Sequence, residues 1–131
     1  MSALGPVAAI AASGMAAAET RLNVAAQNVA NADSRGAVSG APAPYRPLRA
    51  DLTSMSAGGV MASVSAQQSA SELAYDPSAP FADAEGMVAS PAVDMALQLI
   101  NMRIAMRQFQ ASVQVFRAAD ATSKTLLDIK A

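Results

Sequence analysis

The sequence predicts a mainly α-helical protein with a small β insertion, in which long N- and C-terminal helices pair as a coiled-coil-like axial bundle around a β-hairpin-rich middle. Two observations predict this fold class. Apolar residues recur at helical spacing over residues 1–32 and again over residues 92–129. The stretch between them combines short alternating runs with clusters of Gly, Pro and Ser. We expect an N-terminal axial helix (1–34), a loop and small β-rich outer region (35–90), and a C-terminal axial helix (91–131).

The first helix carries an uncharged, alanine-rich seam. Its members follow one another at steps of four and three, the spacing that keeps one helix face toward a partner helix: Leu4, Ala8, Ala11, Met15, Ala18, Leu22, Ala25 and Val29. The few large side chains contribute roughly 1.5–3 kcal/mol each when buried, whereas ordering each backbone residue costs about 1–2 kcal/mol. We therefore predict that both terminal segments are largely unstructured in the isolated monomer and become helical when several subunits enclose them.

Strands are expected in the middle of the chain. Residues 48–52 and 60–64 alternate apolar and polar side chains, and the run 56–59 between them ends in Gly58-Gly59, so a β-hairpin is predicted. A third short strand is expected over residues 72–75, and turn residues follow it.

The second helix carries two apolar stripes that are displaced by two residues and therefore lie on roughly opposite sides. One stripe consists of Val93, Leu97, Ile100, Ile104, Ala111, Val115, Ala118, Thr122 and Ile129. The other consists of Met102, Met106, Phe109, Val113, Phe116 and Leu127. One stripe can satisfy the partner helix of the same chain, so two stripes imply more than one neighbour. We read the methionine and phenylalanine stripe as packing rather than a cofactor site, and as an inter-subunit seam in preference to an intrachain core.

Four amide side chains near the end of the first helix form its main polar feature. Asn23, Gln27 and Asn31 share one helix face, and Asn28 lies beside it. Our interpretation is that these amides hydrogen-bond neighbouring subunits and fix their axial register, as buried polar positions do in coiled coils. The alternative is a solvated face with a helix cap at Asn31.

Composition argues against an enzyme. The chain has no Cys and no His, which removes thiolate nucleophiles, the commonest general base and the commonest metal ligands. Asp76, Asp83 and Glu85 lack the spacing of a calcium loop. A net charge of −1 provides no broad field for nucleic acid. We expect no catalytic residue, cofactor, metal site, nucleic-acid partner or small-molecule substrate.

The uncharged beginning of the chain invites comparison with a leader peptide or membrane helix. Ala16-Ala17-Ala18 imitates a cleavage site, but no Lys or Arg precedes Arg21, and a signal peptide needs a basic start. A spanning helix needs about 20 strongly apolar residues. We expect neither a cleaved signal nor direct membrane insertion.

Two rival readings of the chain remain. One is a lipid-surface amphipathic protein, which needs a Lys-rich polar face. The other is a cytoplasmic coiled-coil adaptor, which explains the seams but not the middle of the chain.

Several motifs resemble those of one protein family. Residues 21–32, Arg-Leu-Asn-Val-Ala-Ala-Gln-Asn-Val-Ala-Asn-Ala, are similar to the N-terminal signature of bacterial flagellar axial proteins, the rod, hook and hook-associated subunits. Tyr75-Asp76-Pro77, followed by residues 83–88, resembles the mid-chain signature of the proximal-rod subunits, and residues 91–129 resemble their C-terminal helix. The stretch 36–44 departs from the usual pattern, because it adds Ala, Pro and Gly residues before Tyr45.

This resemblance implies a structural role in the flagellar basal-body rod. Such a subunit assembles with copies of itself and other rod proteins and transmits torque from motor to hook. The alternative within the family is another axial subunit. The resemblance further implies passage unfolded through the flagellar type III export apparatus, without a cleaved signal, and a final place in the periplasmic rod. The helices would then pack in an inner tube with the β-rich middle outward.

Overall fold

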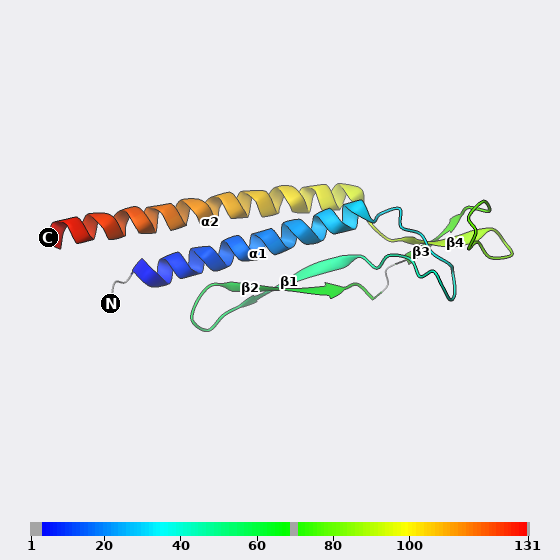
Figure 1. The fold of residues 1–131 in the computed structure, drawn as a ribbon, viewed down its shortest axis with the longest axis horizontal. Coiled ribbons are helices and arrows are strands. Elements are labelled where there is room, and N and C mark those ends of the chain that lie inside the picture. The colour runs from blue at the N-terminus through cyan, green and yellow to red at the C-terminus, as the bar shows by residue number, and fades with distance from the viewer. Residues whose placement is uncertain (1–3, 69–70, 131) are drawn as a thin grey trace.

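The computed structural model describes residues 4–68 and 71–130, and its helices occupy the two terminal segments. Helix α1 spans Leu4–Ala30 and helix α2 spans Met95–Lys130. They lie side by side and antiparallel along the long axis of the molecule, so that the first residue of α1 and the last residue of α2 lie toward the same end (Figure 1). The Asp94 carboxylate accepts a hydrogen bond from the Leu97 amide at 3.0 Å, which caps the first turn of α2.

The middle of the chain forms two separate antiparallel sheets of two strands each. Strands β1 (Leu48–Ser54) and β2 (Val60–Ala66) pair from Leu48 opposite Ala66 to Ser54 opposite Val60, and they pack along α1. Strands β3 (Ser71–Tyr75) and β4 (Met87–Pro91) pair beyond the end of the helices (Figure 1). The second sheet is therefore the distal tip of an elongated molecule.

The expectation of a hairpin-rich middle beside a coiled-coil-like bundle is wrong. Among the described residues only β1 and β2 form a tight hairpin; β3 and β4 are joined by the long turn-rich segment 76–86. Sequence reasoning overlooked β4 because Val88 and Ala89 are both buried, so the strand shows no apolar-polar alternation. The turn residues expected after the third strand therefore connect two paired strands.

The contact between α1 and α2 is made by small and polar residues. Buried positions on the helices are Ala11, Ala17, Ala18, Val24, Ala25 and Asn28 on α1, with Gln98, Ala105 and Ala119 on α2. A Cβ atom at Gly14 would lie 2.8 Å from the Ser112 hydroxyl oxygen, so the helices approach closely there. This differs from a coiled-coil seam, in which large apolar side chains fill the space between helices.

The hairpin is fastened to the first half of α1. The Ser13 hydroxyl donates to the Ile10 carbonyl at 2.7 Å and accepts from the Val60 amide at 3.1 Å. Gly59, with φ +93°, lies so close to Ser13 that a Cβ atom would overlap its hydroxyl. Neither described helix combines the length and apolarity needed to cross a bilayer.

Candidate assembly site

One buried amide joins four segments of the chain. Asn28 is 1% exposed, near the end of α1. Its Nδ2 donates to the Leu48 carbonyl at 2.8 Å and to Gln98 Oε1 at 3.3 Å. Its Oδ1 accepts from the Leu48 amide at 2.8 Å and from the Tyr45 hydroxyl at 3.0 Å. The side chain thus uses two donors and two acceptors, its full hydrogen-bonding capacity.

The arrangement fixes where the β1–β2 hairpin begins. By pairing with both backbone groups of Leu48, Asn28 acts as a short piece of strand at the first residue of β1. Tyr45 donates to the same amide, and burial raises the pKa of the Tyr45 hydroxyl, so this donor stays protonated. We call Asn28 and its partners Tyr45, Leu48 and Gln98 the hub. The hub holds α1, α2 and the hairpin in one register.

The other amides of the predicted stripe lie differently. Asn23 and Gln27 are exposed, and Asn31 is half-buried. Asn31 Nδ2 donates to the Gln27 carbonyl at 2.9 Å, and its Oδ1 accepts from the Ser34 hydroxyl at 3.3 Å, so it serves the local helix end. The hydrogen bonds of Asn28 are made within the chain. We therefore leave Asn28 out of the proposed inter-subunit contacts.

Sequence reasoning did not single out Tyr45 or Gln98. A signal exists for Gln98, because it begins a seven-residue series on α2: Gln98, Ala105, Ser112 and Ala119. Asn28 likewise continues the series Gly14 and Arg21 on α1. Seven-residue spacing places the members of each series on one helix face. These two series face each other, and the Arg21 guanidinium donates to Gln108 alongside them.

The larger side chains of the predicted α1 seam lie beside the buried positions of this helix rather than among them. Met15, Leu22 and Val29 are half-buried. Leu4 is the first residue of α1, and its side chain lies outside the described part of the structure. Apart from Asn28, the buried positions of α1 are occupied by alanine and by Val24, because α2 and the hairpin both approach this helix closely.

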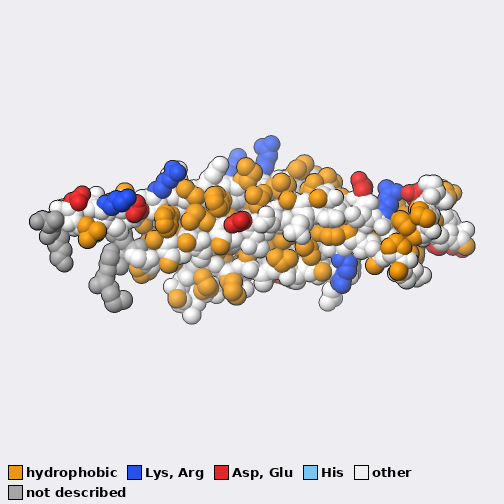
Figure 2. All heavy atoms as spheres, in the orientation of Figure 1, with side chains coloured by type: hydrophobic (Ala, Val, Ile, Leu, Met, Phe, Trp, Pro, Cys, Tyr) orange, Lys and Arg blue, Asp and Glu red, His pale blue; other side chains and the backbone are white. Residues whose placement is uncertain are grey.

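Both apolar stripes of α2 are left at the surface. We call Leu97, Ile100, Ile104 and Val115 the Leu97 stripe, and each of these residues is exposed, Ile100 by 54%. We call Met102, Met106, Phe109, Val113 and Phe116 the Met106 stripe; Met102 and Val113 are half-buried and the other three are exposed. Leu127, further along, is 68% exposed. Figure 2 shows apolar side chains along the visible face of both helices.

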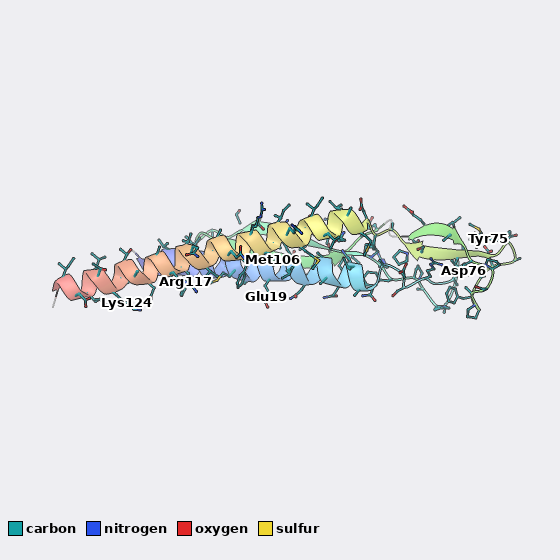
Figure 3. All side chains as sticks on the ribbon, turned by 90° about the horizontal axis from the view of Figure 1, so that it is seen from above. Glu19, Tyr75, Asp76, Met106, Arg117 and Lys124 are labelled. Carbon is teal, nitrogen blue, oxygen red and sulfur yellow. The ribbon has the colours of Figure 1, made fainter. Side chains whose placement is uncertain are left out.

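The Met106 stripe borders an open groove between the two helices. The groove has a volume of about 420 Å³ and is lined by Ala18, Glu19, Leu22, Ala105, Met106, Phe109 and Gln110. Figure 3 shows Glu19 and Met106 on neighbouring helices midway along the pair. Apart from the Glu19 carboxylate and the Gln110 amide, the lining is apolar, so the groove suits another apolar surface.

The Tyr75-Asp76-Pro77 motif lies at the opposite end of the molecule from Lys124 (Figure 3). Tyr75 is 71% exposed. Asp76 Oδ1 accepts from the Ser78 hydroxyl at 2.7 Å, and Asp76 Oδ2 pairs with Arg35 at 3.2 Å. The Ser78 hydrogen bond, with a contribution from Arg35, lowers the pKa of Asp76. Asp76 therefore holds the turn that follows β3 in place, and the Tyr75 side chain faces solvent.

A backbone bridge connects the tip to the segment that follows α1. Gly36 and Ala89 exchange two amide-to-carbonyl hydrogen bonds, each of 2.9 Å. A Cβ atom at Gly36 would overlap the backbone of Pro42, Ala43 and Pro44, so only glycine fits where this loop closes. Within residues 4–68 and 71–130, no group of three acidic, His or Cys side chains is placed to hold a metal ion.

Comparisons with known proteins agree with the motifs. The family model described as flagellar basal body rod FlgEFG protein C-terminal matches residues 84–129, which include β4 and nearly all of α2. The flagellar basal-body rod protein FlgC of Salmonella typhimurium is 40% identical over 110 residues, covering 81% of this chain and 82% of that protein. FlgC of Escherichia coli O157:H7 is 41% identical over 112 residues, with the same coverage.

A more distant relative extends the match across the entire chain. FlgC of Agrobacterium fabrum is 34% identical over 140 aligned positions, covering 100% of this chain and 99% of that protein. Similarity at this level over the full length, including both terminal helices and the Tyr75-Asp76-Pro77 motif, establishes to which family the chain belongs. The chain belongs to the FlgC family of flagellar basal-body rod proteins.

Proposed function

We propose that this chain builds the proximal part of the rod by packing the exposed stripes of α2 against copies of itself and other rod proteins, and that it thereby transmits torque from motor to hook. Membership in the FlgC family makes the chain a structural subunit of the flagellar basal-body rod. The names of its relatives describe a rod protein and no catalytic activity. The proposal concerns which surfaces perform that structural role.

One observation carries the proposal. The intrachain contact uses mostly alanine, glycine and polar residues, whereas most large apolar side chains of α2 remain exposed, with Met102 and Val113 half-buried. Burying one Leu, Ile or Phe side chain contributes roughly 1.5–3 kcal/mol. Ile100 and Phe109 are 54% and 41% exposed, so a large part of this stabilisation is not realised in the single chain. Neighbouring subunits on both flanks of the helix pair would supply it.

The three-part division of the chain fits this role. We infer that the terminal segments 1–34 and 91–131 form the axial wall and that region 35–90 faces outward. The distal sheet supports this, since it extends beyond the helices and exposes Tyr75. We further infer that the chain is exported unfolded through the flagellar type III apparatus without a cleaved signal and assembles in the periplasm. A sparse intrachain core, easily unfolded, suits that route.

Replacement of the Leu97 stripe tests the proposal. The variant carries Leu97→Gln, Ile100→Gln and Ile104→Gln in the full-length chain, which keeps good helix-forming residues on α2. We expect it to be exported at the normal level but to be missing from purified basal bodies, with loss of swimming. Immunoblots of the exported fraction and of purified basal bodies measure export and incorporation.

A matched control changes three exposed polar residues of the same helix, Gln114→Ala, Lys124→Gln and Asp128→Asn. It should enter basal bodies and support swimming as the natural chain does. Normal incorporation of the Leu97-stripe variant would contradict the proposal.

A further inference from the structure

The groove between α1 and α2 combines an apolar lining with one acidic group. Leu22, Met106 and Phe109 provide apolar surface, and Glu19 is exposed at the groove. None of the ion pairs among the described residues involves Glu19. A surface that fits this groove should therefore be apolar with a basic residue at its margin.

The Leu97 stripe of α2 has that composition. At 3.6 residues per turn, Arg103 and Arg107 lie on the helix face adjoining Ile100 and Ile104. Both arginines are exposed, and neither has an acidic partner in the part of the chain that the structure describes. Arg107, seven residues after Ile100, is therefore the basic residue beside this apolar row, on the flank away from the groove, whereas Arg103 shares the face of Gln110 at the groove.

The two surfaces also lie at the same level along the molecule. Asn28 contacts Gln98 and Arg21 contacts Gln108, and a Cβ at Gly14 would touch Ser112, so the helices run past each other in a fixed register. Glu19 shares the groove with Met106 and Gln110 and is therefore level with Arg107. A neighbouring molecule shifted sideways, with little axial displacement, brings its Arg107 to this height.

We propose that the groove is occupied by α2 of a second copy of this chain, whose Ile104 enters it beside Leu22 while Arg107 pairs with Glu19. The contact is heterologous, since one flank of each copy meets the opposite flank of the next. Repetition therefore gives each inner copy one filled groove and one covered Leu97 stripe. This inference rests on the proposed function and names the partner at one of its surfaces.

Photo-crosslinking from the groove identifies the occupant. p-Benzoylphenylalanine replaces Gln110, a groove residue, in the full-length chain, and assembled basal bodies are irradiated. Coexpression with a tagged copy and mass spectrometry identify the partner and the attached segment. We expect an adduct between two copies, attached within residues 97–107 of the second copy.

Charge reversal then tests the ion pair. Glu19→Arg and Arg107→Glu should each lower the adduct yield about tenfold, because like charges then face one another at every contact. The double variant should recover at least about half of the yield, since the pair is restored with reversed signs. Glu19→Arg combined with Arg117→Glu is the control and should not recover, because residue 117 lies about 15 Å further along the helix.

Two results would overturn the inference: an adduct that joins the groove to a different rod protein, or a double variant that recovers no better than the control. Failure of the proposed function is distinguished by a separate measurement, the amount of the natural chain in purified basal bodies. If the chain is present there and the adduct contains another protein, the inference alone is wrong. If the chain is missing from basal bodies, the proposed function is wrong and the inference falls with it.

Discussion

At the distal end of the helix pair, α1, α2, the hairpin and the segment before it converge on the amide of Asn28, whereas toward the chain termini the helices meet through alanine, glycine and serine. The first region is polar, buried and fully paired. The second has close backbone approach but few large side chains in contact. Its large apolar residues lie on the outside.

In most small proteins large apolar side chains form the core and polar side chains face water. This chain differs from that pattern in both respects. Here a polar hub sets the geometry of the single chain, and apolar side chains are kept at the surface. We infer that in such a subunit only the surroundings of Asn28 have a defined register before assembly, and that the main hydrophobic stabilisation comes from neighbours. Changes at the two regions should therefore have different consequences.

Removal of the hub should have the largest effect. Asn28→Ala leaves the part-buried Leu48 amide and carbonyl without their side-chain partner, at up to about 1–3 kcal/mol for each group. We expect the amount of chain in basal bodies to fall about tenfold or more, since 1.4 kcal/mol corresponds to a factor of ten. Quantitative immunoblotting of purified basal bodies measures this loss.

Asn23→Ala is the matched control, because Asn23 is an exposed amide on the same helix. It should change incorporation by less than about twofold, as expected for an exposed site. Equal losses for the two variants would show that the hub has no special role. A combined Asn28→Ala and Asn31→Ala variant should also fail to assemble while being exported normally, and unchanged swimming would contradict this.

A bulky residue at the close helix approach should have an intermediate effect. Gly14→Leu inserts a side chain where the Ser112 hydroxyl already lies within 2.8 Å of an added Cβ, and such overpacking costs about 1–3 kcal/mol. Gly14→Ala requires only rotation of that hydroxyl and gains about 1 kcal/mol of helix propensity. We expect Gly14→Leu alone to reduce incorporation; similar behaviour of the two variants would argue against tight packing here.

Acid should affect the distal tip by the smallest amount. The Ser78 hydrogen bond and Arg35 lower the pKa of Asp76 from its usual 3.8, so the ionised loop is favoured. The resulting stabilisation is fully present above pH 3.8 and is lost as the pH falls through the lowered value. Carboxyl NMR titration should give a midpoint below 3.8, moved upward by Ser78→Ala. An unchanged midpoint in Ser78→Ala would show that the Ser78 hydrogen bond does not lower the pKa of Asp76.

Much of this architecture follows from sequence periodicity, but the functional geometry follows only in part. Helical spacing indicates where α1 and α2 lie, and alternation indicates β1 and β2. The same spacing places Leu97 and Met106 on different faces of α2 but does not reveal which face meets α1. That choice depends on Gly14 and Ser112, small residues whose close approach only the tertiary structure shows.

The polar hub illustrates a second limit. Asn28 stands one residue away from Gln27 in a run of similar amides, and one step turns a helix by about 100°. Burial of one and exposure of the other depend on where the hairpin packs. Tyr45 comes from a loop whose path the sequence pattern does not specify.

Amide hydrogen exchange on the dilute, purified monomer tests most directly the claim that neighbours complete this fold. We predict rapid exchange over residues 8–23 and 108–130, with any protection confined to the surroundings of Asn28, and slow exchange of both helices in assembled rods. Strong protection across residues 8–30 in the dilute monomer would contradict the claim.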